Sequence, residues 1–240
     1  MNDLLDINRG GDCWTFTLNR TAKMNALSAE MVEALIQGIE DAHASAARML
    51  AFVGAGRNFC AGFDFSDIEN QSEGDLLLRF VRIETLLRSV ASSPCLTVAF
   101  AHGRNFGAGV DLFAVCKQRY STPDASFQMP GLKFGLVLGS RRFCELVGRT
   151  AALDILQEAR SVAAAEAQDI GLVLRMAQRD DWPALVADAQ RIASALPVQA
   201  QKQLYKALDT DLADRDMADL VRSAACPGLK KRISDYLAER

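Results

Sequence analysis

The sequence has little of what most metal and disulfide sites require. It contains only two histidines, and its six cysteines are scattered with no C-x-x-C spacing. These features argue against a zinc site and against a disulfide framework. We therefore interpret the cysteines as reduced, structural thiols and expect no metal.

Long apolar runs and an excess of one charge are also missing. No segment approaches the roughly 18 apolar residues of a spanning helix, and the opening MNDLLDINRGGD lacks the charged start and apolar run of a signal peptide. The 27 Lys and Arg residues stand against 30 Asp and Glu, a net charge of −3. Such a balance favours neither nucleic acid nor an anionic membrane. We expect a cytoplasmic protein that binds neither.

What the sequence does contain is a regular order of apolar segments. Half of its 240 residues are apolar, which suffices for a sizeable core. CWTFTLN alternates like a half-buried strand, and Ser28 is a good N-cap for a helix with Met31, Leu35 and Ile39 on one face. The runs MLAFVG and CLTVAF predict buried strands, each leading into a glycine-rich loop and then a helical pattern.

After residue 140 the pattern is mainly helical. Strands alternating with helices early and helices late predict an α/β core followed by a helical region. Two other functions are disfavoured. GAGRNF begins like a dinucleotide-binding G-x-G-x-x-G, but Phe59 replaces the third glycine. No G-x-S-x-G elbow of a serine hydrolase is found.

Three ordered segments resemble a known family. LNRTAKMNALS resembles LNRPxKxNALS, GAGRNFCAGFDF resembles GxGxxFCAGxDL, and SPCLTVAFAHGRNFGAGVDLFAVC resembles KPVIAAVxGxxxGGGxELALxCD. These are the motifs of the crotonase (enoyl-CoA hydratase/isomerase) superfamily. Their order and approximate spacing agree, and a weaker resemblance covers most of the remaining chain.

The resemblance implies an α/β fold built as a spiral of ββα units over residues 1–190, with a C-terminal helical trimerisation region at 191–240. It also implies homotrimers or dimers of trimers, and an acyl-CoA thioester whose coenzyme A is part of the substrate, with no other cofactor. The backbone N–H groups of Phe63 and Ala108 would bind the thioester oxygen. Residues expected along the substrate are Lys23, Met24, Ala61, Gly62, Asp64, Gly107, Gly131 and Arg141.

Two positions depart from the family pattern. Asp111 stands where hydratases carry their first glutamate, so its carboxyl is retracted by about 1.5 Å. Gly131 stands at the second and cannot transfer a proton. Two-carboxylate hydration is therefore disfavoured. Asp111 is either a single general acid or base, or a water-positioning group, or an aspartate favoured by the dipole of a helix's first turn.

Two further charged residues allow more than one interpretation. Arg141 is either a partner for a substrate carboxylate or a solvated or subunit-contact residue at a helix start. Asp64 is interpreted as a loop-structuring group. We expect an acyl-CoA-processing enzyme of hydratase/isomerase type that stabilises a thioester enolate. The alternatives are an acyl-CoA hydrolase, a decarboxylase, or a noncatalytic acyl-CoA-binding protein that has lost the second glutamate.

Overall fold

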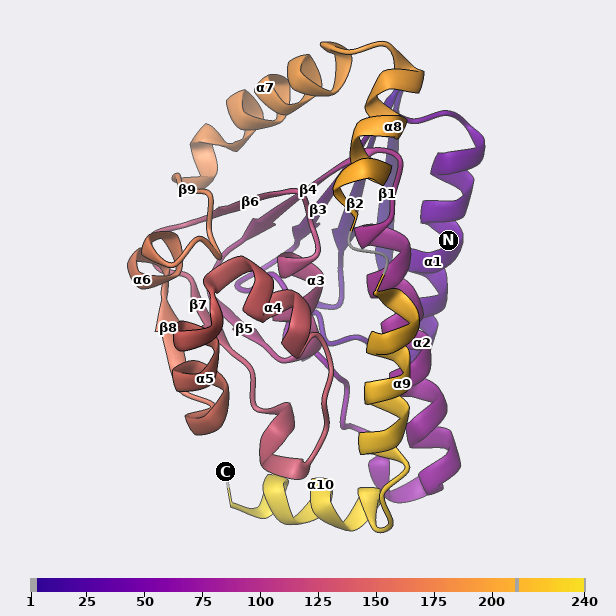
Figure 1. Cartoon of the computed structure of the whole chain (residues 1–240), viewed down its shortest axis with the longest axis vertical. Coiled ribbons are helices and arrows are strands. Elements are labelled where there is room, and N and C mark those ends of the chain that lie inside the picture. Colours follow the sequence, from indigo (N-terminus) through magenta and orange to yellow (C-terminus); the bar gives the residue numbers. More distant parts are fainter. Residues whose placement is uncertain (1–3, 210–211, 240) are drawn as a thin grey trace.

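The computed structural model describes residues 4–209 and 212–239, which form a mixed α/β body (Figure 1). Within this part of the chain, the larger sheet runs in the order β1-β2-β3-β4-β6-β9. β1 and β2 are antiparallel, and every later neighbour is parallel. Its strands are β1 (Leu5–Gly10), β2 (Cys13–Leu18), β3 (Met49–Gly54), β4 (Leu96–Ala101), β6 (Gln118–Ser121) and β9 (Arg175–Met176).

A smaller sheet lies beside the first and has the order β5-β7-β8. Its strands are β5 (Arg104–Phe106), β7 (Ser126–Gln128) and β8 (Ser161–Ala163). Helices follow pairs of strands along the chain: α1 (Ala29–Ala44) follows β1 and β2, α3 (Ala108–Ala114) follows β4 and β5, and α4 (Ser140–Val147) follows β6 and β7. This order confirms the predicted spiral of ββα units. After β3, the bridge between Leu27 and Phe63 replaces the second strand, and α2 (Glu73–Ala91) follows.

Local capping explains where the first helices begin. The Ser28 side chain accepts a hydrogen bond from the Met31 N–H at 3.3 Å, which satisfies a donor that has no acceptor inside the helix. Ser72 and Asp75 form a capping box at the start of α2. The first of these helices was predicted from the Ser28 cap.

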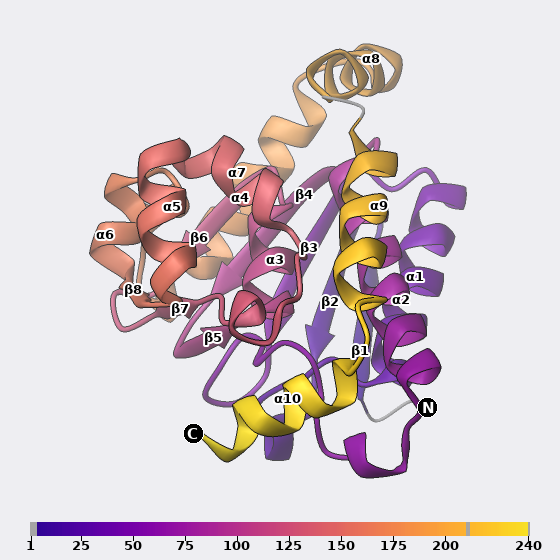
Figure 2. The ribbon, with the colours of Figure 1, turned by 60° about the horizontal axis from the view of Figure 1, so that its bottom comes forward.

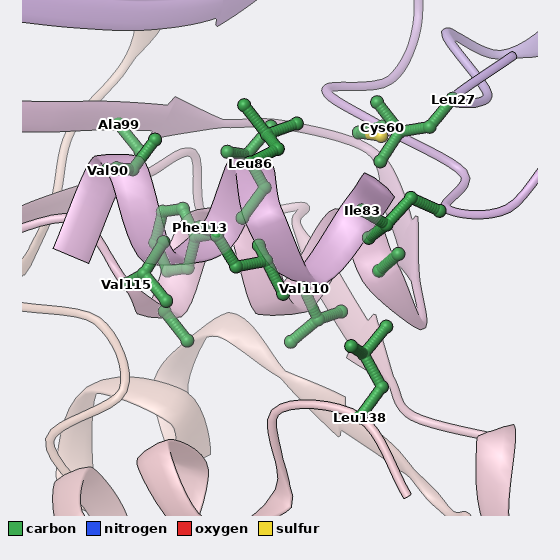
Figure 3. Close-up of a cluster of buried hydrophobic side chains, with 14 of the residues drawn as sticks. Leu27, Cys60, Ile83, Leu86, Val90, Ala99, Val110, Phe113, Val115 and Leu138 are labelled. Carbon is green, nitrogen blue, oxygen red and sulfur yellow. The ribbon is translucent and has the colours of Figure 1, made fainter. Parts of the chain in front are cut away.

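The two faces of the larger sheet bury separate cores. Because side chains alternate across a strand, Val98 and Phe100 of β4 pack toward one face and Ala99 toward the other. Figure 3 shows Ala99 beside Leu86 of α2 and Phe113 of α3. This tight packing of α2 on α3 holds the start of α3 in a fixed place.

The later helices are α5 (Arg149–Glu158), α6 (Ala164–Asp169), α7 (Trp182–Ser194), α8 (Val198–Leu208), α9 (Ala213–Ala224) and α10 (Leu229–Ala238). α9 runs alongside α2, and α8 and α10 lie at opposite ends of the body (Figure 2). The predicted boundary between residues 190 and 191 falls inside α7, which packs on the sheet through Trp182 and Ala193. Among the described residues, no helix combines the length and apolarity that crossing a membrane requires.

Candidate active site

Two loops meet at the end of β3 and the start of α3. The Phe106 N–H donates to the Cys60 carbonyl at 3.2 Å, which joins the loops directly. At Gly62, with φ +80°, a Cβ would lie 2.3 Å from the Phe106 oxygen and 3.1 Å from the Ala108 nitrogen. Only glycine permits this approach. The contact brings the residue after Gly62, which is Phe63, close to Ala108.

The N–H groups of Phe63 and Ala108 are both unused. In the bridge to Leu27, the Leu27 N–H donates to Gly62 and the Asp64 N–H donates to Leu27, so the Phe63 N–H has no role in it. Ala108 is the first residue of α3, where an N–H has no acceptor inside the helix. Neither group donates a hydrogen bond within the described part of the chain.

Phe63 and Ala108 both line one apolar cavity of about 610 Å³, counting the part open to solvent. Its walls are mainly aromatic and aliphatic, and its lining contains no Lys, Arg or His among the described residues. Asp111 supplies the ionisable carboxyl group, and Ser140 supplies a hydroxyl. The lining residues are Ala61, Phe63, Phe65, Phe80, Phe106, Gly107, Ala108, Asp111, Met129, Pro130, Gly131, Leu132, Phe134, Leu136, Leu138, Ser140, Leu156 and Tyr236.

A more open groove continues from this cavity. The two share Ala61, Phe63, Phe65 and Phe106, and the groove is also lined by Lys23, Met24, Ala26, Asp64, Ser66, Arg104 and Gln128. Most of the residues predicted to lie along a substrate are therefore found around one continuous hollow. The hollow has an apolar inner part and an outer part that carries two cationic side chains.

Asp64 has a structural explanation. It is buried, and its carboxylate pairs with Arg20 at 2.6 Å and accepts hydrogen bonds from the Ser66 N–H and hydroxyl. Burial alone would raise the pKa of Asp64, but the bonds from Ser66 and the Arg20 charge outweigh it, so the pKa is lowered. These contacts hold Asp64 in the loop that carries Phe63.

Asp111 is enclosed in α3 and only 3% exposed. Burial raises its pKa well above the usual carboxyl range, the Glu84 charge raises it further, and Arg142 acts in the opposite direction. Its Oδ1 atom has no hydrogen-bond partner among the described residues. Gly139, with φ +66°, lies against it so closely that a Cβ there would be 1.8 Å from Oδ1. Burial therefore favours the neutral form of this carboxyl group, which is tightly confined.

Gly131 opens the short 3₁₀ turn Gly131–Phe134 at the cavity wall. Lacking a side chain, it adds no second carboxylate to the cavity. Gly107 is the N-cap of α3, and its carbonyl accepts hydrogen bonds from the Val110 and Asp111 N–H groups at 2.8 and 3.0 Å. It thereby fixes the first turn from which Ala108 faces the cavity.

Two predicted substrate-binding residues, Gly62 and Arg141, line neither part of the hollow; Gly62 lies at the contact between the two loops, whereas Arg141 points elsewhere. Its guanidinium donates to both carboxylate oxygens of Asp216 in α9 at 2.6 Å, and it also pairs with Glu145. This placement corrects the expectation that Arg141 lies near the acyl group. Two carboxylates already balance its charge, and the contact joins α4 to α9.

Several residues of the cavity were not predicted. They come from five separate segments and are Phe65, Phe80, Phe134, Ser140 and Tyr236. Three of the rings pack in a row: Phe65 meets Phe134 at 6.2 Å and Phe134 meets Tyr236 at 5.3 Å between centroids. Only the F-x-F spacing at 63–65 offered a signal, because both rings follow the loop motif. Tyr236 is too distant in sequence to be linked to it.

The described residues contain no group of three or more His, Cys, Asp or Glu side chains arranged to hold a metal ion. The cavity itself offers main-chain donors, one carboxyl group and an apolar wall. That combination suits the binding of a polar head with an apolar tail.

Comparison with known proteins gives consistent results. Residues 11–225 match the model of the family described as enoyl-CoA hydratase/isomerase. The chain is 34% identical over 195 residues to the Mycobacterium bovis protein "Probable enoyl-CoA hydratase echA6", covering 79% of this chain and 77% of that one.

Solved structures agree in fold. A crystal structure of an enoyl-CoA hydratase/isomerase family protein from Bordetella parapertussis is 59% identical, with a TM-score of 0.98 over 99% of both chains. The enoyl-CoA hydratase of Bacillus halodurans has a TM-score of 0.85 over 97% of this chain and 99% of its own, at 20% identity, a likeness of fold alone.

Proposed function

This chain belongs to the enoyl-CoA hydratase/isomerase family, and we propose on that premise that it converts acyl-CoA thioesters by stabilising an enolate. One observation carries the proposal: Phe63 and Ala108, whose N–H groups are unused, line the same apolar cavity from two loops in direct contact. A thioester oxygen bound there gains two donors that strengthen as negative charge develops. Loss of one such donor typically costs about 2.7–4 kcal/mol.

Asp111 is the proposed proton-transfer group. A neutral carboxyl can donate a proton from one oxygen while the other accepts one, so a single group can serve both transfers of a hydration or a double-bond shift. In hydration, water adds to the β-carbon, its proton passes to Asp111, and the original Asp111 proton passes to the α-carbon. The absence of a side chain at Gly131 is then no obstacle in principle, but it leaves the water without a second base.

The same cavity disfavours decarboxylation of a carboxylated acyl group. A substrate carboxylate inside it would meet no Lys, Arg or His among the described lining residues. An unpaired buried charge of this kind is costly. The acyl group should therefore be apolar and uncharged beyond the thioester.

The groove accounts for the rest of the substrate. Lys23 and Met24 lie where the phosphates and adenine of coenzyme A would leave the cavity, and Arg104 adds a second cation. We propose no cofactor other than the coenzyme A of the substrate. A cytoplasmic homotrimer, or a dimer of trimers, is part of the same proposal. Several apolar residues along and just before α8 are exposed, which supports a further subunit contact: Leu196, Val198, Leu204 and Leu208.

Gly131 favours a second candidate, a noncatalytic acyl-CoA-binding protein. Purified protein assayed against a panel of enoyl-CoA esters, with loss of enoyl absorbance as readout and calorimetry for binding, separates the two. We expect turnover that Asp111→Asn abolishes while affinity is kept, with Asp235→Asn on the surface of α10 as matched control. Tight binding without turnover would favour the noncatalytic candidate. Absence of binding to any ester would overturn both.

A further inference from the structure

A buried ion-pair network lies behind Asp111, outside the cavity lining. Arg142 of α4 donates to both oxygens of Glu84 in α2, at 2.5 and 3.1 Å. It also pairs with Asp216 of α9 at 3.0 Å. The Glu84 side chain is 1% exposed and the Arg142 side chain 11%. A fully buried carboxylate on the core face of a helix is unusual, because charged side chains are rarely buried unless an opposite charge pairs with them.

This network adjoins the candidate proton donor. α4 begins at Ser140, directly after the glycine that touches the Asp111 carboxyl group, and Arg142 follows two residues later. α2, which carries Glu84, packs against α3. The charges of Glu84 and Arg142 are the two that act on Asp111.

The other titratable groups near α3 include two thiols and, beyond its C-terminal end, Lys117, whose pKa burial lowers to about 8. Cys60 lies in the loop against α3 and Cys116 at the end of α3, and burial raises the pKa of each thiol to about 12. The charge that Asp111 experiences therefore depends on how the guanidinium groups of α4 are already paired.

The buried charges balance without Asp111. The two cations, Arg141 and Arg142, face the two buried carboxylates of Glu84 and Asp216, and the 44% exposed Glu145 adds a further negative charge. No guanidinium in the described network is left to pair with Asp111. An ionised Asp111 would then be an uncompensated buried charge.

We propose that Glu84 and Asp216 are positioning residues that hold the Arg142 guanidinium away from Asp111 and so keep the Asp111 carboxyl group neutral and able to donate a proton. The inference rests on the proposed function of Asp111. It adds a link to the C-terminal region, because Asp216 comes from α9. Without Glu84, the released guanidinium would stabilise the ionised form of Asp111. The resting group would then become an ion-paired carboxylate.

The test compares Glu84→Gln with wild type across pH. Asp111 protonation is followed by the infrared band of its neutral carboxyl, identified by its loss in Asp111→Asn, and turnover is followed in parallel. We expect the band, and the high-pH limit of turnover, to shift to lower pH by about one unit, the size for a newly favourable cation. Glu145→Gln removes an exposed carboxylate of the same network and should leave both unchanged.

Removing both partners supplies the decisive comparison. Glu84→Gln combined with Arg142→Met takes away the carboxylate and the cation together, so the infrared titration should return toward that of wild type. An unchanged titration in Glu84→Gln, or no return in the double variant, would overturn the proposal. Should Glu84→Gln not fold, Asp216→Asn must show a smaller shift in the same direction. The infrared measurement does not require turnover. It therefore tests the role of Glu84 even if the proposed activity is not found.

Discussion

Substitution of Gly139 by alanine tests how tightly Asp111 is confined. The new Cβ would lie 1.8 Å from Asp111 Oδ1, whereas ordinary contacts begin near 3.4 Å. The carboxyl group would have to retreat by about 1.6 Å, since α3 is fully buried and cannot move as a unit. A displacement of about 1 Å can reduce turnover roughly 10²-fold. We expect at least that loss.

Stability should fall as well. Alanine at φ +66° costs about 1 to 2 kcal/mol from backbone geometry, and forcing a methyl group into a packed site costs about 1 to 3 kcal/mol more. Gly11 is the matched control, because its φ is +63° and no atom lies within 4 Å of a Cβ built there. Gly11→Ala should show the backbone cost alone and keep full turnover.

Urea unfolding of both variants measures the two costs, and steady-state turnover with the best ester of the panel measures the effect on catalysis. The difference between the two variants isolates the contact with Asp111. The reasoning would be refuted if Gly139→Ala kept wild-type turnover and lost no more stability than Gly11→Ala. Such a result would mean that the carboxyl group moves freely or takes no part in the reaction.

Three further variants test other parts of the site. Gly62→Ala places a Cβ 3.1 Å from the Ala108 nitrogen and 2.3 Å from a carbonyl oxygen, so the loops must separate; turnover should fall by about 10²-fold, and unchanged kinetics would argue against paired donors. Gly131→Glu has only a backbone oxygen at 3.2 Å to displace and should increase hydration of a short enoyl-CoA in the assay; a folded variant without that gain would mean that a missing carboxylate is not limiting. Asp111→Asn tests how the protonation of this group affects stability. Because burial raises the pKa of Asp111 in the folded state, the group's contribution to the free energy of unfolding is fully present at low pH and is lost as pH rises toward the folded pKa. In urea titrations, the unfolding free energy of Asp111→Asn should therefore increase relative to that of wild type as pH rises. A pH-independent difference would contradict this.

Local signals were sufficient for the longer elements. The helix α1 (Ala29–Ala44) was predicted, because the Ser28 cap and the apolar residues of one face lie within the segment itself. The three-residue strands β5, β7 and β8 were missed. They pair with partners distant in the chain, and at this length alternation gives no usable pattern.

The candidate site divides in the same way. Phe63 and Ala108 were predicted from two motifs whose small residues allow two loops to come into contact. Both residues line the cavity. Arg141 was misplaced because its direction is set by Asp216, 75 residues further along the chain. Tyr236 was missed for the same reason. The roles of residues in a loop motif can be inferred from the neighbouring sequence. The direction in which a charged side chain of a helix points depends on partners far along the chain.

The alanine in G-A-G illustrates how the structure resolves an apparent departure. Glycine is usual at position 108, and alanine would be strained if that residue required positive φ. In this chain the positive φ of +45° falls on Gly107, whereas Ala108 starts α3 without a positive φ. A methyl group at Ala108 therefore costs no backbone strain, and its N–H keeps the position that the helix start gives it. The departure at Asp111 is different in kind, because it moves a reacting group, and a proton donor with a retracted carboxyl should act on substrates seated deeper against α3 than those of a glutamate enzyme.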